Sequence, residues 1–393
     1  MRTLVLAALL LSAPLAASAA QTTTDLGVTV LMNGFSTDAR VNNSDVPQFV
    51  LPTDPADPLG EGALGGTIRQ TRATLTARMD AVEALGGAAV DGELDVDFFG
   101  GQQPSTGGRT FPLPRIRRAF AVVAWPSLEL LVGQESPPIA MVSPSSLASV
   151  GFPGFASAGN LWLWLPQVRV TGLVPLTRAA EGGPPLELGI EAAALAPTSG
   201  EPQDPFTTRP DRAERSRRPY LQGRVLARWG EGDEAGEVGV GGHLGWLALA
   251  GGERATSKAL AASALLPVGR MLELRAEAFT GEALAGLGGG GIGQSLGPGD
   301  VPVRTRGGWV QLNVRPAAGF ELGASAGMDD PEDEDLPAAG AARLRNRVIA
   351  GHLLWRPGPL LVGLEVRELR TRYPAPTAER QAVHVNLALG MEL

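Results

Sequence analysis

The chain has 393 residues, of which 33 are Lys or Arg and 41 are Asp or Glu, so its formal net charge is -8 at pH 7. A mildly acidic balance gives no reason to expect a nucleic-acid partner. The chain contains no cysteine, which excludes a disulfide scaffold, a Cys-based metal site and a lipid-modified N-terminal cysteine.

The first residues, MRTLVLAALLLSAPLAASAA, have the three parts of a secretory signal. Arg2 supplies the positive start, residues 4–11 the apolar segment, and residues 17–20 the small side chains for cleavage. A retained membrane anchor is disfavoured, because the apolar run is too short to span a bilayer. We therefore expect a signal peptide at 1–20 and one exported domain at 21–393.

After the leader no apolar run approaches the roughly 18 residues of a membrane helix, so the exported domain is either soluble or a membrane barrel. Apolar and polar side chains alternate with a period of two, which is typical of strands. Taken in chain order, the predicted strands are 25–36, 67–80, 88–99, 114–124, 128–134, 166–172, 185–196, 219–229, 236–250, 255–266, 271–281, 306–316, 319–328, 344–355, 360–372 and 381–393.

The segment at 90–98 shows the pattern clearly, with Asp91, Glu93, Asp95 and Asp97 on one face and apolar residues or glycine on the other. In the next predicted strand the same reasoning places Arg115 and Arg117 on one face. It places Ile116, Phe120 and Val122 on the opposite face, together with Arg118. An outward Arg118 would lie at the rim or against a neighbouring subunit; the alternative is that the register assigned to this strand is shifted.

About sixteen such segments, mostly roughly 9 to 14 residues long, match tilted strands that cross a bilayer. Their connections alternate between long and short, as do the external loops and periplasmic turns of outer-membrane barrels. The alternative is a secreted β-sandwich or propeller, whose strands average about 5 to 6 residues. The pattern therefore predicts an all-β fold, a transmembrane antiparallel β-barrel of about 16 strands.

A barrel of this size encloses water, and the polar faces of its strands form the wall. Two interpretations of the wall charges remain open. Arginines can guide anionic solutes past a row of carboxylates, or the charges can pair across strands and stiffen the wall. The candidates for pore lining and substrate selectivity are Arg72, Arg78, Asp91, Glu93, Asp95, Asp97, Arg115, Arg117, Arg169, Arg224 and Arg275.

The long apolar insertion at 135–164, which contains GFPGF and two tryptophans, predicts a constriction loop folded into the barrel. An external loop that covers a neighbouring subunit is the alternative. The acidic run at 329–335 lacks the central glycine of a calcium loop, and the glycine-rich 286–293 lacks the Lys-Ser/Thr of a phosphate-binding loop. The three histidines are scattered. We expect no cofactor, no metal and no catalytic residues.

Several stretches resemble the DcaP-like family of bacterial outer-membrane porins when they are taken together. They are GELDVDFFG, PRIRRAFAVV with LLVGQ after it, PQVRVTG, AFTGEALAGLGGGGIGQSL, GMDDPEDEDL, RNRVIAGHLLW and GLEVRELRTRY. The resemblance implies a sixteen-stranded barrel, usually trimeric, that passes small solutes, in some relatives negatively charged ones such as dicarboxylates. It also implies that Arg115 and Arg117 belong to a basic pore ladder and that 135–164 is the inward loop. The chain departs from the pattern because it lacks a helical N-terminal extension and ends in Leu393 rather than an aromatic residue.

These observations predict a passive porin of the bacterial outer membrane that favours small anionic solutes such as organic acids. We expect a homotrimer embedded in outer-membrane lipid, without enzymatic activity. Two alternatives stay open: an outer-membrane barrel enzyme of the lipase or protease type, and a structural barrel whose lumen is plugged.

Overall fold

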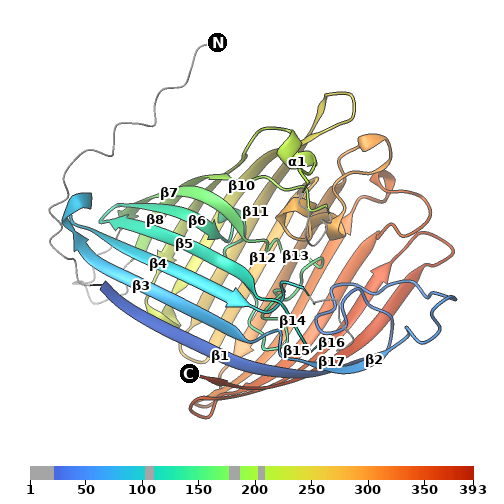
Figure 1. Ribbon diagram of the computed structural model, residues 1–393, viewed down its shortest axis with the longest axis horizontal. Helices are drawn as coiled ribbons and strands as arrows, with labels where there is room; N and C mark the ends of the chain where they lie inside the picture. The colour runs from blue at the N-terminus through green and yellow to red at the C-terminus, as the bar shows by residue number, and fades with distance from the viewer. Residues whose placement is uncertain (1–21, 102–109, 177–185, 202–208) are drawn as a thin grey trace.

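The computed structural model describes residues 22–101, 110–176, 186–201 and 209–393, so the predicted leader lies outside the described residues. The described chain forms a closed antiparallel β-barrel (Figure 1). Among the described residues, no helix is both long and apolar enough to cross a membrane.

The strands are β1 (Thr22–Thr37), β2 (Ala63–Thr67), β3 (Arg72–Val82), β4 (Ala88–Asp97), β5 (Arg115–Trp125), β6 (Leu128–Glu135), β7 (Leu165–Pro175), β8 (Leu186–Leu195), β9 (Tyr220–Trp229), β10 (Gly236–Ala248), β11 (Arg254–Val268), β12 (Leu272–Glu282), β13 (Arg304–Val314), β14 (Phe320–Pro331), β15 (Arg345–Trp355), β16 (Leu360–Arg372) and β17 (Glu379–Glu392). The helical segments are short: α1 (Arg212–Arg215), η1 (Glu83–Leu85), η2 (Pro138–Ala140), η4 (Gly232–Glu234), η5 (Ala285–Leu287), η6 (Gly290–Gly293), η7 (Pro298–Asp300) and η8 (Asp333–Asp335).

From β3 onward each strand pairs with the next in the sequence, and β17 pairs with β1 to close the ring. The strands β2 and β3 pair with successive parts of β1, so the 17 segments fill sixteen positions of the barrel. The predicted sixteen-stranded barrel is therefore confirmed. The first described strand, β1, begins and β17 ends at the end of the barrel that carries the short turns, as an even number of positions requires.

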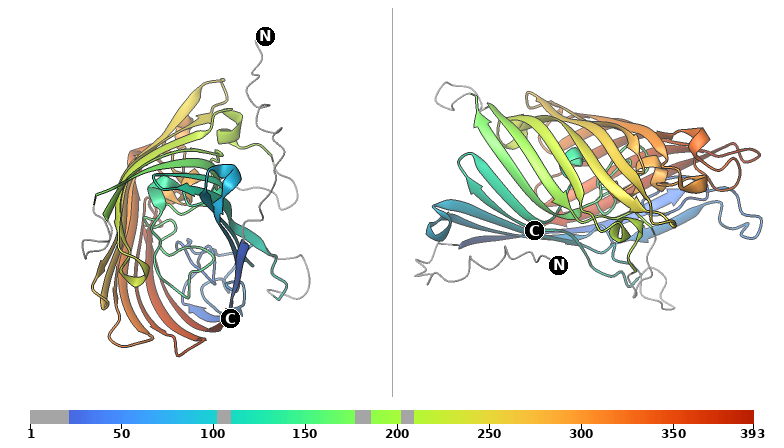
Figure 2. Two further views of the ribbon diagram at one scale, coloured as in Figure 1. Left: turned by 90° about the vertical axis from the view of Figure 1, so that its left-hand side faces the viewer. Right: turned by 90° about the horizontal axis from the view of Figure 1, so that it is seen from above.

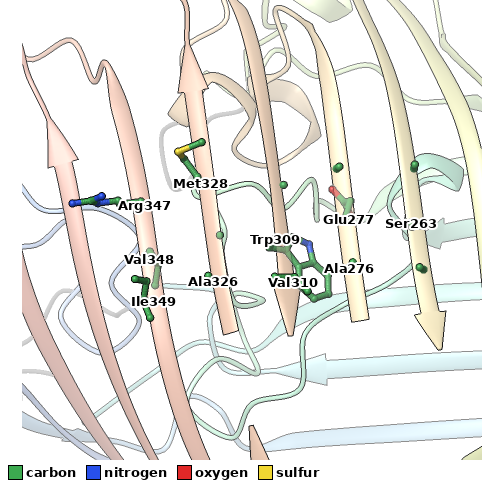
Figure 3. Close-up of a pocket in the computed structure, with 15 residues that line it drawn as sticks. Ser263, Ala276, Glu277, Trp309, Val310, Ala326, Met328, Arg347, Val348 and Ile349 are labelled. Carbon is green, nitrogen blue, oxygen red and sulfur yellow. The ribbon is translucent and has the colours of Figure 1, made fainter. Parts of the chain in front are cut away.

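The two faces of the strands differ in the way the alternation predicts. In β17, Val385, Leu387 and Leu389 are 38%, 46% and 49% exposed on the outer face, whereas His384 and Asn386 are buried on the inner face. Figure 3 shows the same division in β12 and β13, where Glu277 and Trp309 are buried and Val310 is exposed among small outer residues. An apolar outer surface of this kind matches hydrocarbon rather than water.

Aromatic residues mark one edge of this apolar surface. Phe320 and Trp355, both 39% exposed, lie on the outer face where strands meet short turns, and their rings stack with their centroids 5.7 Å apart. Tryptophan and phenylalanine at this height form the interfacial girdle of outer-membrane barrels.

The predicted orientation of Arg118 is wrong, because a β-bulge interrupts β5. Asp95 of β4 pairs with Arg118 and Val96 pairs with Ile116, so the register shifts by one residue between them. A bulge places two consecutive residues opposite one partner and re-aims the side chains that follow. Arg117 and Arg118 consequently both reach the inner carboxylates, and Phe120 and Val122 face inward opposite Glu93 and Asp91.

Gly133 of β6 lies opposite Phe120, just beyond the bulge, with φ +135. A Cβ atom at this position would lie 2.3 Å from the Ala119 carbonyl oxygen and 2.5 Å from the Phe120 Cα. We expect Gly133→Ala to lower the free energy of unfolding by about 2 to 4 kcal/mol, because the strained backbone and the clash add. Urea unfolding in lipid vesicles measures the change. Gly172→Ala, where nothing lies within 4 Å of the added Cβ, is the control and should be nearly neutral.

The barrel also contains an apolar core on its inner side, where loops pack together. Ile139 and Leu161 of the loop after β6 pack with Leu284 and Leu287 of the loop after β12, and with Tyr220 of the wall. The Tyr220 hydroxyl donates to the carbonyl oxygen of Thr198 at 2.6 Å. The end of the barrel with the long loops is therefore partly filled by its own connections.

Candidate functional site

The loop at 136–164 crosses the interior and is tied to opposite sides of the wall (Figure 2, left view, green-blue). The Asn33 side chain of β1 donates to the Leu147 carbonyl at 2.9 Å. On the other side the Gln311 amide of β13 bonds to Ser145 in both directions, at 2.7 and 2.9 Å. The infolded loop that the sequence predicts is thus confirmed by its contacts.

Further bonds hold the middle of this loop. The Ser146 hydroxyl donates to Glu365 of β16 at 2.6 Å, and Arg367 of the same strand bonds to Ser149. The Gln70 amide donates to the Ala148 carbonyl at 2.7 Å and accepts from the Val150 amide at 2.5 Å. Contacts with residues far apart in the sequence therefore fix where the loop lies.

The loop narrows the interior to a cavity of about 500 Å³. Arg72, Arg117 and Arg118 line it from β3 and β5, and Arg275 of β12 lines it as well. The loop contributes small polar side chains: Ser136, Ser143, Ser145, Ser146 and Ser149. The cavity wall is therefore rich in guanidinium groups and hydroxyls, with Glu135 among its carboxylates.

The carboxylates of β4 lie behind these arginines. Asp95 is fully buried and accepts from Arg72 Nε at 2.8 Å, with Arg117 Nη1 at 3.3 Å and Arg118 Nε at 3.5 Å. Asp97 is also fully buried and pairs with Arg115 at 2.6 Å and Arg117 at 3.6 Å. The acidic row predicted to face the solute faces inward, but it serves to hold the guanidiniums in place.

Aromatic residues of the loop complete this arrangement. The Arg117 guanidinium carbon lies 4.7 Å from the Trp164 ring centroid, and the Arg115 guanidinium carbon lies 5.2 Å from that of Phe152. Arg115 Nη2 also donates to the Gly151 carbonyl at 2.6 Å. Cation–π contacts and a short bond to the backbone join the basic strand to the loop, so the position of one depends on the other.

The other predicted residues fall into three environments. Arg78 and Asp91 lie 3.7 Å apart near a short turn, with side chains 59% and 42% exposed. Arg169 is buried and donates to the Met141 sulfur at 3.1 Å, and Arg224 is buried between Glu191 at 3.6 Å and Glu237 at 2.5 Å. Arg275 pairs with Glu273 at 2.6 Å and donates to the Ser143 carbonyl at 2.9 Å. The structure brings Arg72, Arg117 and Arg275 to the cavity and leaves Arg78, Arg169 and Arg224 apart from its lining.

Sequence reasoning missed four charged cavity residues: Arg118, Glu135, Arg356 and Glu392. Arg118 bonds to Glu93 and lies 3.0 Å from Glu135. The available signal for Arg118 was the set of three arginines at 115, 117 and 118. Strict alternation would turn one of the two adjacent arginines away from the row of carboxylates. A bulge is needed for both of them to face that row.

Arginines pair with part of the acidic run at 329–335. Arg304 Nε bonds to Asp335 at 2.8 Å, Arg372 Nη2 to Asp333 at 2.7 Å and Arg306 Nη2 to Asp330 at 3.2 Å. The hydrogen bond from Arg304 holds the pKa of Asp335 below its ordinary value. Among the described residues, no group of three or more His, Asp and Glu side chains is arranged to hold a metal ion.

The nearest approach to a hydrolase arrangement involves His243. Its Nε2 lies 3.1 Å from the Ser257 hydroxyl and its Nδ1 lies 3.2 Å from the Gln222 amide nitrogen. Ser257 is 1% exposed, and its hydroxyl donates to the Ala283 carbonyl at 2.9 Å. The hydroxyl is thus buried and joins the wall to the loop after β12 by a hydrogen bond.

No family model matches the chain, and no curated protein matches it. Solved structures do match over nearly the whole chain. The outer membrane channel DcaP of Acinetobacter baumannii is 15% identical, with a TM-score of 0.66 and coverage of 96% of this chain and 99% of DcaP. An anion-selective porin from Comamonas acidovorans is 11% identical, with a TM-score of 0.59 and coverage of 95% and 100%. OprB of Pseudomonas putida is 11% identical, with a TM-score of 0.53 and coverage of 94% of both chains. The chain therefore has the fold of outer-membrane porins and is similar in structure to DcaP.

Proposed function

We propose that the protein is an outer-membrane porin through which small hydrophilic solutes diffuse passively, with a preference for anions such as organic acids. One observation carries the proposal: five guanidinium groups, those of Arg72, Arg117, Arg118, Arg275 and Arg356, line the cavity beside the inward loop, while Asp95 and Asp97 are covered behind them. The solute therefore meets positive charge first. Charged rings at a narrow passage set ion selectivity in this way.

The fold, the apolar outer surface and the aromatic girdle support a location in the outer membrane. We also propose a homotrimer, as in the trimer form of OmpT of Vibrio cholerae, which shares the fold at a TM-score of 0.52.

Planar-bilayer recording of the purified protein in a salt gradient tests the proposal. We expect stepwise conductance and a reversal potential of the sign that anion flow produces. Small dicarboxylates should interact with the channel more strongly than monovalent cations of similar size. They should either block the current more strongly or carry more of it. A reversal potential of the opposite sign would contradict the proposed anion preference.

The two alternatives predict different results. A structural barrel would give no current in the same recording, and the apolar core between the loops is the feature that favours it. A barrel enzyme would be labelled by a serine-reactive probe. The burial of Ser257 argues against that outcome at the described Ser–His contact.

A further inference from the structure

A groove of about 690 Å³ lies on the outer surface of the barrel, at the ends of β6 to β9 that carry the long loops. Its floor is apolar and is formed by outward side chains of three neighbouring strands, among them Val132, Val168 and Ala194. Val168 is 48% exposed and Val132 is 50% exposed. In an outer-membrane barrel this face lies in the outer leaflet, so the groove opens toward lipid chains rather than toward the pore.

Two arginines stand at the upper edge of the groove. Arg217 and Arg218 both line it and both are exposed. Among the residues that the structure describes, neither forms an ion pair with a carboxylate. The carboxylate that also lines the groove, Glu214, accepts a hydrogen bond from the Asp211 backbone N–H at 2.7 Å, within the capping box of α1.

Arg218 is held at the height of the membrane interface. Its guanidinium carbon lies 4.9 Å from the ring centroid of Trp246, an outward residue near the end of β10. An amphipathic indole at the lipid boundary, with a cation over its face, fixes the charge at the level of the headgroups. Arg306, an exposed arginine of the outer face at the same end of the barrel, differs because it pairs with Asp330 at 3.2 Å.

We propose that this groove binds a phosphate-bearing lipid of the outer leaflet, with its phosphate on Arg217 and Arg218 and an acyl chain along Val132, Val168 and Ala194. Charge complementarity selects this occupant. Two guanidiniums without described carboxylate partners favour an anionic headgroup, and the apolar floor below them favours a hydrocarbon chain. The inference needs the barrel to lie in an outer membrane, but it does not depend on the proposed anion preference of the pore.

Native mass spectrometry of the detergent-purified full chain tests the site, with bisphosphorylated lipid A and a phosphatidylcholine as the two probes. The double variant Arg217→Gln/Arg218→Gln is expected to bind lipid A roughly 30-fold more weakly, since each arginine near an anionic surface contributes about fivefold. Binding of phosphatidylcholine should not change. Arg306→Gln removes one outward arginine elsewhere on the same rim and should leave lipid A binding unaltered.

A second pair of variants tests the acyl part of the groove without changing charge. Ala194→Trp fills the floor and is expected to weaken lipid A binding, whereas Ala192→Trp, one outward position further along β8 and outside the groove lining, should not. Inorganic pyrophosphate distinguishes a lipid site from a simple anion site. Equal displacement by pyrophosphate at the same concentration, or unaltered lipid A binding in the double variant, would overturn the proposal. The reversal potential of the double variant should equal that of the parent, so failure here is separable from failure of the pore hypothesis.

Discussion

Replacing Arg72 and Arg118 together by glutamine is expected to lower the anion-to-cation permeability ratio of the channel by about tenfold. The reason lies in what the two side chains cover: Arg72 bonds to Asp95, and Arg118 bonds to Glu93 and Glu135. A unit charge about 6 Å from a passing ion in water changes its energy by about 0.7 kcal/mol, which screening in about 0.1 M salt reduces to about 0.4 kcal/mol, or about twofold in partitioning. The effect has opposite sign for anions and cations, so each charge changes their ratio by about fourfold and the loss of two charges lowers it by about tenfold. The uncovered carboxylates act in the same direction.

The reversal potential in a salt gradient measures this ratio. Glutamine keeps a hydrogen-bond donor toward each carboxylate, and retained heat-modifiable migration would show that the barrel still folds. Arg78→Gln is the matched control, because Arg78 is 59% exposed near a short turn and lies outside the cavity. An unaltered anion-to-cation permeability ratio in the folded double variant would contradict a role of these arginines in selectivity.

Arg367→Leu is expected to lower the free energy of unfolding by about 3 to 5 kcal/mol, the usual result of removing one partner of a buried ion pair. Arg367 pairs with Glu365 on the inner face of β16, with side chains only 6% and 7% exposed. The substitution leaves the Glu365 carboxylate buried beside Ser146 and removes the bond from Arg367 to Ser149. We therefore also expect the loop at 136–164 to be held less firmly at β16, which should raise single-channel conductance and its noise.

Urea unfolding in lipid vesicles and single-channel recording together check this expectation. The same strand supplies the control: Glu368 and Arg370 form a pair of the same spacing, but their side chains are 35% and 34% exposed. Exposed pairs contribute about 0 to 1 kcal/mol, so Arg370→Leu should have little effect on either measurement. Adding Glu365→Gln to Arg367→Leu should recover part of the stability, because it removes the uncompensated charge. Equal losses in Arg367→Leu and Arg370→Leu would argue against the special role of the buried pair.

The barrel itself was predictable because its signal is local. In β17 and β4 the side chains alternate strictly, so the residues of each strand alone show which of its faces is apolar. The alternation of long and short connections indicated an even number of strands. An even number predicts that the first strand begins and the last strand ends on the same side of the barrel. The inward loop was also predictable, since 136–164 is too long and too apolar for an external connection.

The candidate site was only partly predictable. The charged positions of β3, β4, β5 and β12 were recognised, but the extent to which each side chain is buried was not. Asp95 and Asp97 belong to the same alternating row as Asp91, yet the first two are fully buried and Asp91 is exposed at the rim. Burial depends on which guanidiniums and which loop cover a carboxylate, and alternation carries no information about either.

The sequence by itself determined the two-faced strands, their number and the supply of charges on the inner face, because these follow from a period of two read along one chain. Only the tertiary structure decided which charges meet the cavity. A one-residue bulge in β5 turned Arg118 inward, and the loop at 136–164 bonded to Arg115, the partner of Asp97, while Arg72, Arg117 and Arg275 stayed on the cavity wall. The register of paired strands and the docking of a distant loop are set by contacts between residues far apart in the chain, such as Ser146 with Glu365, and no local pattern records them.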